Sequence, residues 1–194
     1  CGSKPELLIA LALLDTPGAL LVCNGYKDRA YVETALLAQR LGRTPILVID
    51  RYPELDLVIR VSRELGIRPH IGVRARLTTR SVGKWADSSG ERSKFGLSAA
   101  EMVEAVDRLK AEKMLDCLEL MHFHIGSQIT AIRAHKDALR EACRIFVGLH
   151  AMQALPLVAW FAARRRGTRE RARVGVVAGA AVSYAALFLL LLVH

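Results

Sequence analysis

The sequence predicts an α/β fold: a partial (β/α)8 TIM-type barrel of about four βα units, followed by a two-helix transmembrane hairpin. Over residues 1–144, short apolar segments alternate with segments of helical periodicity, which is typical of consecutive βα units and a parallel sheet. Polar side chains fall where these apolar segments end, and in a barrel that rim carries the site. Residues 145–194 instead hold two long uncharged runs. We therefore divide the chain into a barrel domain, 1–144, and a hydrophobic helical hairpin, 145–194.

The predicted strands and helices follow from the spacing of apolar residues and from the residues that begin and end each segment. Gly42 and Gly66 end two helical patterns, and Ser98 with Glu101 forms a capping box at the start of another. A doubly wound sheet competes with the barrel, but no glycine fingerprint follows the first strand. We expect strands at 19–23, 45–49, 70–74 and 117–123, and helices at 5–14, 28–41, 53–65 and 98–113 and from residue 130 onward.

Charge and cysteine usage exclude two classes of protein. Residues 164–173 hold six Arg and one Glu, and so carry +5 of the formal net charge of +9. No aromatic residues interleave this Arg run, so we expect no nucleic-acid partner. The four cysteines lie far apart without CxxC spacing. A reduced, cytoplasmic origin fits them better than a disulfide framework or a zinc site, and we expect no metal ligands.

The strand expected at 117–123 runs directly into the strongest candidate site. His124 can lie against a flat aromatic cofactor, Gly126 lets backbone N–H groups approach a phosphate, and Ser127 can donate a hydrogen bond to it. We interpret the neighbouring His122 as a packed or hydrogen-bonded structural histidine. Arg74, at the end of another strand, is a candidate for the same rim.

Five stretches of residues 1 to about 144 match one family in the same order. They are Gly2-Ser3-Lys4-Pro5-Glu6-Leu7, Cys23-Asn24-Gly25-Tyr26-Lys27-Asp28, Gly72-Val73-Arg74-Ala75-Arg76-Leu77, Ser93-Lys94-Phe95-Gly96-Leu97-Ser98 and His122-Phe123-His124-Ile125-Gly126-Ser127-Gln128. Together these stretches resemble the biosynthetic arginine decarboxylases. These are pyridoxal 5′-phosphate (PLP) enzymes of the group IV decarboxylases with an alanine-racemase-like barrel. The hairpin matches no family.

The resemblance implies a role for each candidate. His124 is similar to the imidazole that stacks on the pyridine ring, and Ser127 to a phosphate ligand beside Gly126. Arg74 resembles the strand-end arginine near the phenolic oxygen of the cofactor. The implied reaction converts L-arginine to agmatine and CO2, for polyamine and spermidine biosynthesis, with magnesium as a further candidate cofactor. The loop Lys94-Phe95-Gly96 resembles a family motif to which we assign no role.

The resemblance also implies what the chain lacks. The family's Schiff-base lysine precedes the first matched residue, and neither Lys27 nor Lys94 stands at its position. The glycine-rich phosphate loop, expected after residue 144, does not follow. We therefore assign no catalytic residue and expect the chain to be inactive alone. A non-catalytic partner of an intact homologue, and a homo-oligomer, are alternatives.

The two uncharged runs, 145–163 and 174–193, are each long enough to cross a hydrocarbon core of about 30 Å. The Arg-rich loop between them should then be cytoplasmic. By resemblance we expect residues 1–144 in the cytoplasm, and membrane association through the hairpin. A small integral membrane protein with a vestigial decarboxylase-like segment is the second interpretation.

Overall fold

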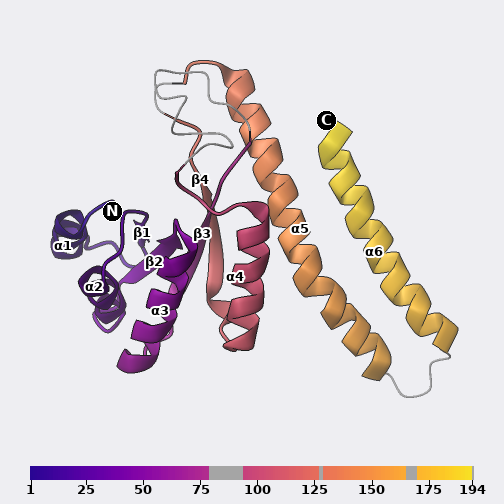
Figure 1. The fold of residues 1–194 in the computed structure, drawn as a ribbon, viewed down its shortest axis with the longest axis horizontal. Coiled ribbons are helices and arrows are strands. Elements are labelled where there is room, and N and C mark those ends of the chain that lie inside the picture. Colours follow the sequence, from indigo (N-terminus) through magenta and orange to yellow (C-terminus); the bar gives the residue numbers. More distant parts are fainter. Residues whose placement is uncertain (79–93, 127–128, 165–169, 194) are drawn as a thin grey trace. The chain divides into compact units, whose positions relative to one another are not determined.

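The computed structural model describes residues 1–78, 94–126, 129–164 and 170–193, with side chains for 1–78, 94–126, 129–151, 174–183 and 185–186 (Figure 1). The chain divides into two units, Cys1–Ile129 and Thr130–His194.

The first unit contains one four-stranded sheet in which every neighbouring pair of strands is parallel. The strands lie side by side in the order β1-β2-β3-β4, so each new strand is added at the same growing edge of the sheet. A barrel wall is built in this way, whereas a doubly wound sheet reverses direction at a switch point. The predicted parallel βα architecture is therefore confirmed. The strands are β1 (Leu20–Cys23), β2 (Thr44–Ile49), β3 (His70–Ala75) and β4 (Leu118–Phe123).

Among the four α-helices described in this unit, three begin at a residue whose side chain caps the helix. Asp28 accepts from the amide of Tyr31 at the start of one helix, and Gly66 ends the next in the left-handed conformation. Ser98 and Glu101 form the capping box that the sequence predicts. The helices are α1 (Lys4–Leu13), α2 (Arg29–Gln39), α3 (Tyr52–Leu65) and α4 (Ala99–Ala111), with a short 3-10 turn, η2 (Leu115–Cys117), before β4.

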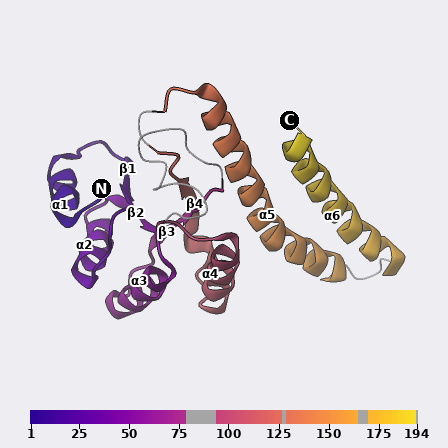
Figure 2. The same ribbon diagram turned by 45° about the horizontal axis from the view of Figure 1, so that its top comes forward.

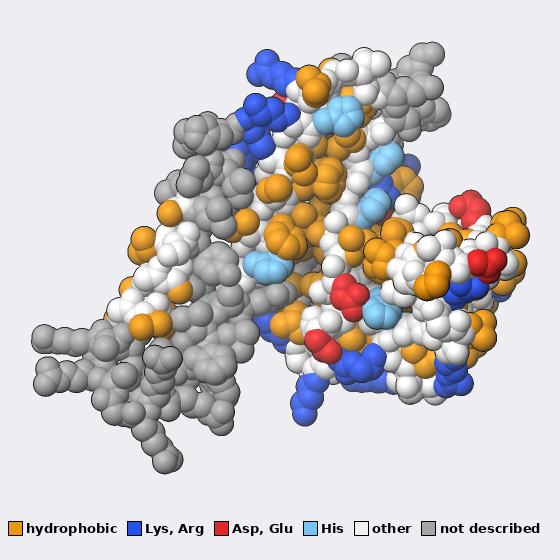
Figure 3. All heavy atoms as spheres, turned by 180° about the vertical axis from the view of Figure 1, so that it is seen from behind, with side chains coloured by type: hydrophobic (Ala, Val, Ile, Leu, Met, Phe, Trp, Pro, Cys, Tyr) orange, Lys and Arg blue, Asp and Glu red, His pale blue; other side chains and the backbone are white. Residues whose placement is uncertain are grey.

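Helices α2, α3 and α4 lie along one face of the sheet (Figures 1 and 2). Alternate strand residues and the apolar stripes of these helices form the core between them, because successive strand side chains point to opposite faces. On the side seen from behind, hydrophobic side chains and histidines reach the surface (Figure 3). The core includes Cys23, Leu47, Ile49, Ile71 and Val73 of the sheet and Val32, Leu36, Leu55, Ile59, Met102 and Leu109 of the helices.

The second unit consists of two helices that pack against each other, α5 (Ile132–Arg164) and α6 (Glu170–Val193). The sequence predicts one helix from residue 130 and a separate apolar helix at 145–163, but the structure contains one continuous 33-residue helix there. The reason is local: residues 139–147 include no Gly, Pro or capping residue that would end a helix. The two compact units meet at 129/130, and the domain bounds 1–144 and 145–194 stay a prediction.

Within the part of the chain that the structure describes, no helix is both long enough and apolar enough to cross a membrane. The transmembrane hairpin predicted at 145–163 and 174–193 is therefore not supported. The apolar run at 145–163 is continuous with an N-terminal portion of α5 that carries Arg133, Lys136 and Asp137.

Candidate functional site

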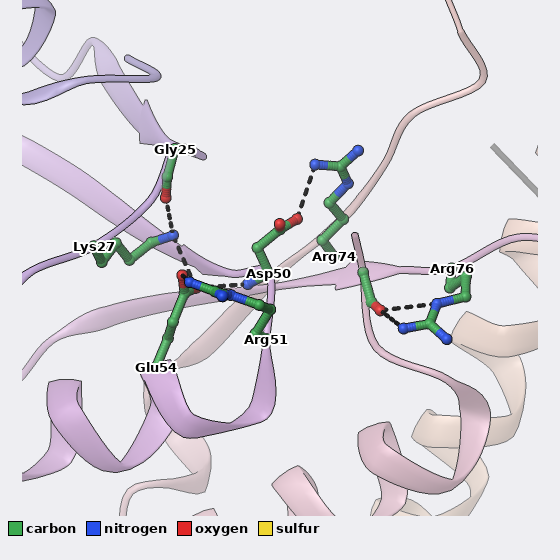
Figure 4. A network of polar contacts seen from close by, with 8 residues as sticks. Gly25, Lys27, Asp50, Arg51, Glu54, Arg74 and Arg76 are labelled. Carbon is green, nitrogen blue, oxygen red and sulfur yellow. Dashed lines mark hydrogen bonds and ion pairs between the residues drawn. The ribbon is translucent and has the colours of Figure 1, made fainter. Parts of the chain in front are cut away.

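The carboxyl ends of the parallel strands bring together charged residues that are far apart in the sequence. Lys27 follows β1, and Asp50 directly follows β2. Arg74 of β3 lies beside His122 of β4 in the strand register. Because parallel strands all end at the same edge of the sheet, these four side chains meet there. Figure 4 shows the polar contacts of this edge.

Arg74 and Asp50 form a largely buried ion pair. The Arg74 Nη1 lies 2.8 Å from the Asp50 Oδ1, and the two side chains are 15% and 9% exposed. Short hydrogen bonds between ionised partners are stronger than neutral ones, and this pair is shielded from water. The guanidinium of Arg74 is therefore held at a defined place above the end of β3.

Lys27 is held by two acceptors of the same edge (Figure 4). Its buried Nζ donates to the carbonyl of Gly25 at 2.7 Å and to the Glu54 Oε2 at 3.2 Å. The same carboxylate oxygen accepts from the amide of Asp50 at 2.9 Å. Burial lowers the pKa of Lys27, and the charge of Glu54 acts against that shift. These contacts give Lys27 a role in joining the ends of β1 and β2.

His122 lies half-buried on the edge strand β4, and its buried Nδ1 has no hydrogen-bond partner among the residues that the structure describes. The pKa of His122 is lowered, first by burial and then by the positive charges of Arg74 and His124. A neutral imidazole therefore stands next to the Arg74 guanidinium. The packed or hydrogen-bonded role expected for His122 is therefore not confirmed. A buried nitrogen without a hydrogen bond costs free energy, and a further group that binds there would remove this cost.

Two of the predicted loop residues are described. His124 is exposed and comes immediately after β4, and Gly126 has φ +108°, a conformation that side chains other than glycine rarely adopt. Ser127 lies outside the described residues. The structure thus places Arg74, His122 and His124 at the ends of the neighbouring strands β3 and β4.

The loop Lys94-Phe95-Gly96, which the sequence leaves without a role, docks onto this edge. The amide of Gly96 donates to the Asp50 carbonyl at 3.0 Å, and the amide of Leu97 to the Arg74 carbonyl at 2.7 Å. The Phe95 ring lies beneath the Arg74 guanidinium, with 5.3 Å from Cζ to the ring centroid. Arg76 donates twice from its half-buried guanidinium to the Gly96 carbonyl (Figure 4).

The residues present fit a flat, anionic aromatic cofactor. An exposed imidazole can lie against its ring, and the Arg74 guanidinium offers further N–H donors to an oxygen. The Nδ1 of His122, which has no hydrogen-bond partner within the described part of the chain, belongs to the strand neighbour of Arg74. The described residues include no group of three or more His, Cys, Asp or Glu that could hold a metal ion.

The family described as "Pyridoxal-dependent decarboxylase, pyridoxal binding domain" matches residues 1–157. The chain belongs to this family. The match extends past residue 144, where we expected the resemblance to stop, and ends inside α5.

Sequence relatives agree with the resemblance that the five motifs predict, which is thereby confirmed. The biosynthetic arginine decarboxylase of Nostoc sp. is 61% identical over 153 residues, and the one of Gloeobacter violaceus is 63% identical over 153 residues. Each match covers 79% of this chain but only 22% and 24% of the relative. The chain thus spans about a quarter of the length of these relatives.

Solved structures show the same fold. The crystal structure of the biosynthetic arginine decarboxylase from Campylobacter jejuni matches with a TM-score of 0.69 and 38% identity, over 79% of this chain and 24% of that one. Diaminopimelate decarboxylase from Helicobacter pylori, complexed with L-lysine, matches with a TM-score of 0.65 over 79% and 38%. At 24% identity, the second match supports a shared fold and nothing more.

Sequence reasoning missed Asp50 and Glu54. Asp50 could have been found, because it directly follows the apolar strand at 45–49, the same kind of position that marked Arg74. Glu54 lies in the first turn of α3, where an acidic residue is ordinary helix chemistry. Its contact with Lys27 depends on how β1 and α3 pack, which the sequence pattern does not encode.

Proposed function

We propose that this chain forms part of the PLP site of an arginine decarboxylase, which converts L-arginine to agmatine and CO2. The observation that supports it most is the convergence of Arg74, His122 and His124 at the carboxyl ends of β3 and β4. The relatives from Nostoc sp. and Gloeobacter violaceus, both named biosynthetic arginine decarboxylases, supply the reaction.

In this proposal each residue has a physical task. His124 places its exposed imidazole against the pyridine ring, and Gly126 leaves room for backbone amides to approach the phosphate. Ser127 donates its hydroxyl to a phosphate oxygen. Arg74 keeps its ion pair with Asp50 and uses another N–H for the phenolic oxygen.

When bound, PLP supplies an electron sink for the negative charge left on the substrate carbon as CO2 departs. His122 stays neutral because burial and Arg74 lower its pKa, so the site does not accumulate a second cation beside the guanidinium. The Lys27 amine is engaged by Gly25 and Glu54. We therefore propose that this chain on its own binds the cofactor without a covalent bond and does not decarboxylate arginine.

Titration of the 194-residue chain with PLP, followed by absorbance, tests the site. We expect His124→Ala to weaken binding about 2- to 10-fold, because an aromatic stacking contact contributes on that order. His135→Ala is the matched control, since His135 is also an exposed histidine but belongs to α5. Equal affinities of the two variants would remove His124 from the site.

Borohydride reduction of the PLP-treated chain tests the non-covalent mode. We expect peptide mapping to find no single lysine labelled at stoichiometric level. Specific labelling of Lys27 would show that its contacts with Gly25 and Glu54 open and that a lysine of this chain reacts with the cofactor.

The alternative role as a non-catalytic partner of an intact homologue stays a prediction. The observation that favours it is that β1 and β4 are the two edges of the sheet, with Leu20 of β1 59% exposed. Co-purification with a full-length arginine decarboxylase would support it, and a chain that never binds such a partner would exclude it.

A further inference from the structure

The Arg74 guanidinium is contacted from two sides by residues that are far from it in the sequence. Asp50, after β2, holds its Nη1, and the Phe95 ring lies under its Cζ. We propose that Asp50 and Phe95 are positioning residues that clamp the Arg74 guanidinium in the orientation in which it meets the phenolic oxygen of the cofactor. This inference rests on the proposed function, and it gives the Lys94-Phe95-Gly96 loop a role.

The two halves of the clamp are chemically complementary. Asp50 is buried and supplies a charge-assisted hydrogen bond of 2.8 Å, which fixes one edge of the guanidinium. Phe95 supplies an aromatic face at 5.3 Å from Cζ, within the range of a cation–π contact. An ion pair at one edge and a ring against the plane leave little rotation to the guanidinium, while its other N–H groups stay available.

Backbone hydrogen bonds anchor the loop to Asp50 and Arg74, the two residues of the ion pair. Gly96 donates to the carbonyl of Asp50, and Leu97 donates to the carbonyl of Arg74. Arg76 donates back to Leu97, and Leu97 forms an isolated parallel bridge with Ala75. The position of Phe95 relative to Arg74 is therefore set by main-chain bonds at the end of β3.

Gly96 makes this docking sterically allowed. Its φ is +85°, and a Cβ at this position would lie 3.0 Å from the Arg76 amide nitrogen and 3.2 Å from the Arg74 carbonyl oxygen. Both atoms belong to the backbone of β3 and its extension, so they cannot move aside as a flexible side chain would. Glycine lets the loop approach the strand without this crowding and so brings Phe95 under Arg74.

Such a clamp has a functional consequence. An arginine side chain has many rotamers, and fixing one of them on ligand binding costs free energy that a pre-organised side chain has already lost. A guanidinium held in place also favours the ionised form of an oxygen placed next to it. The clamp should therefore strengthen discrimination in favour of a ligand that carries a free phenolic oxygen.

The test compares two probes that lack the aldehyde and so form no adducts with lysines: 4′-deoxypyridoxine 5′-phosphate and its 3-O-methyl derivative. The measured quantity is the ratio of their dissociation constants with the 194-residue chain, by calorimetry. We expect the unchanged chain to prefer the free phenol about 10- to 100-fold, as for a hydrogen bond to a charged group. Arg74→Met should abolish this preference.

Three variants then address the clamp. Phe95→Leu should reduce the preference for the free phenol about two- to fivefold. Phe95→Tyr keeps the aromatic face and should show the same preference as the unchanged chain. Tyr26→Leu is the matched control, because Tyr26 carries a similar contact, with Arg51 Cζ 5.2 Å from its centroid, away from Arg74. Asp50→Asn, which keeps the side-chain shape, should reduce the preference independently of Phe95.

The outcomes separate the two proposals. If Arg74→Met leaves the preference unchanged, the proposed contact of Arg74 with the cofactor is wrong. If Arg74→Met abolishes the preference but Phe95→Leu or Asp50→Asn retains it in full, the clamp is wrong while the contact stands. Failure of Phe95→Tyr to restore the preference also overturns the clamp. Circular dichroism of each variant checks its folding, and Asp50→Asn provides the decisive arm if Phe95→Leu does not fold.

Discussion

His122 makes the folding stability of the chain depend on pH. Its folded-state pKa lies below the ordinary value of about 6.5, because burial, Arg74 and His124 disfavour the imidazolium, against a smaller opposite effect of Asp50. As pH falls through 6.5, the unfolded chain takes up the proton first, so this group removes stability in acid. We expect the difference in unfolding free energy between the unchanged chain and His122→Gln to decrease from pH 7.5 to 5, measured in urea. A difference that is constant with pH would contradict the lowered pKa.

Single residues could be placed from the sequence where the backbone alone decides their position. Arg74 and His124 lie at strand ends, as expected, because strand ends can be located from the apolar pattern. The partners of these residues could not be predicted in the same way. The pairing of Arg74 with Asp50 depends on the register between β2 and β3, and its contact with Phe95 on how a distant loop returns to the sheet.

At the scale of elements, the docking of the Lys94-Phe95-Gly96 loop onto β3 is testable through two glycines. Gly42 and Gly96 both have positive φ, but a Cβ at Gly42 meets nothing within 4 Å. Gly42→Ala should therefore lower the free energy of unfolding by only about 1–2 kcal/mol, the cost of placing a Cβ in the left-handed conformation. Gly96→Ala should cost about 1–3 kcal/mol more, because the methyl group overpacks against the backbone of β3. Urea unfolding measures both, and equal losses would mean that the loop approaches the strand less closely.

The elements themselves were largely predictable, with boundaries shifted by one or two residues. β2, expected at 45–49, begins at Thr44, and α3, expected at 53–65, begins at Tyr52. Such shifts arise because a terminal residue joins an element through its own hydrogen bonds, which the apolar pattern does not report. The larger difference lies in α5, where the change from charged to apolar composition at residue 145 predicts that one helix ends and another begins. The composition changes at this point, but no residue there ends a helix, so the helix continues.

For the whole molecule, the strand order carries more information than any single motif. β1 to β4 follow one another without reversal, and the polar strand ends consequently lie along one edge. The sequence predicts this arrangement because each helical segment between the strands is long enough for a crossover. It does not predict where the family-like part stops: the match ends at residue 157, inside α5, although α5 belongs to the second structural unit.

A chimera tests whether this sequence can serve in a complete enzyme. The 153 residues aligned with the Nostoc sp. arginine decarboxylase would replace the corresponding segment of that protein. At 61% identity, most of the buried apolar positions should keep their volume, and cores accept such substitutions at modest cost. We expect the chimera to release CO2 from L-arginine within about tenfold of the parent rate, an order-of-magnitude allowance for small shifts in the geometry of the site.

The graft has to join the parent enzyme in helical register, because the aligned part reaches into the continuous helix α5. In the chimera, His124→Ala should lower the rate strongly, whereas His135→Ala, the matched exposed histidine, should not. Release of CO2 from carboxyl-labelled arginine measures both. A chimera that folds and binds PLP but releases no CO2 would mean that the edge formed by β3 and β4 has lost the geometry that the reaction requires.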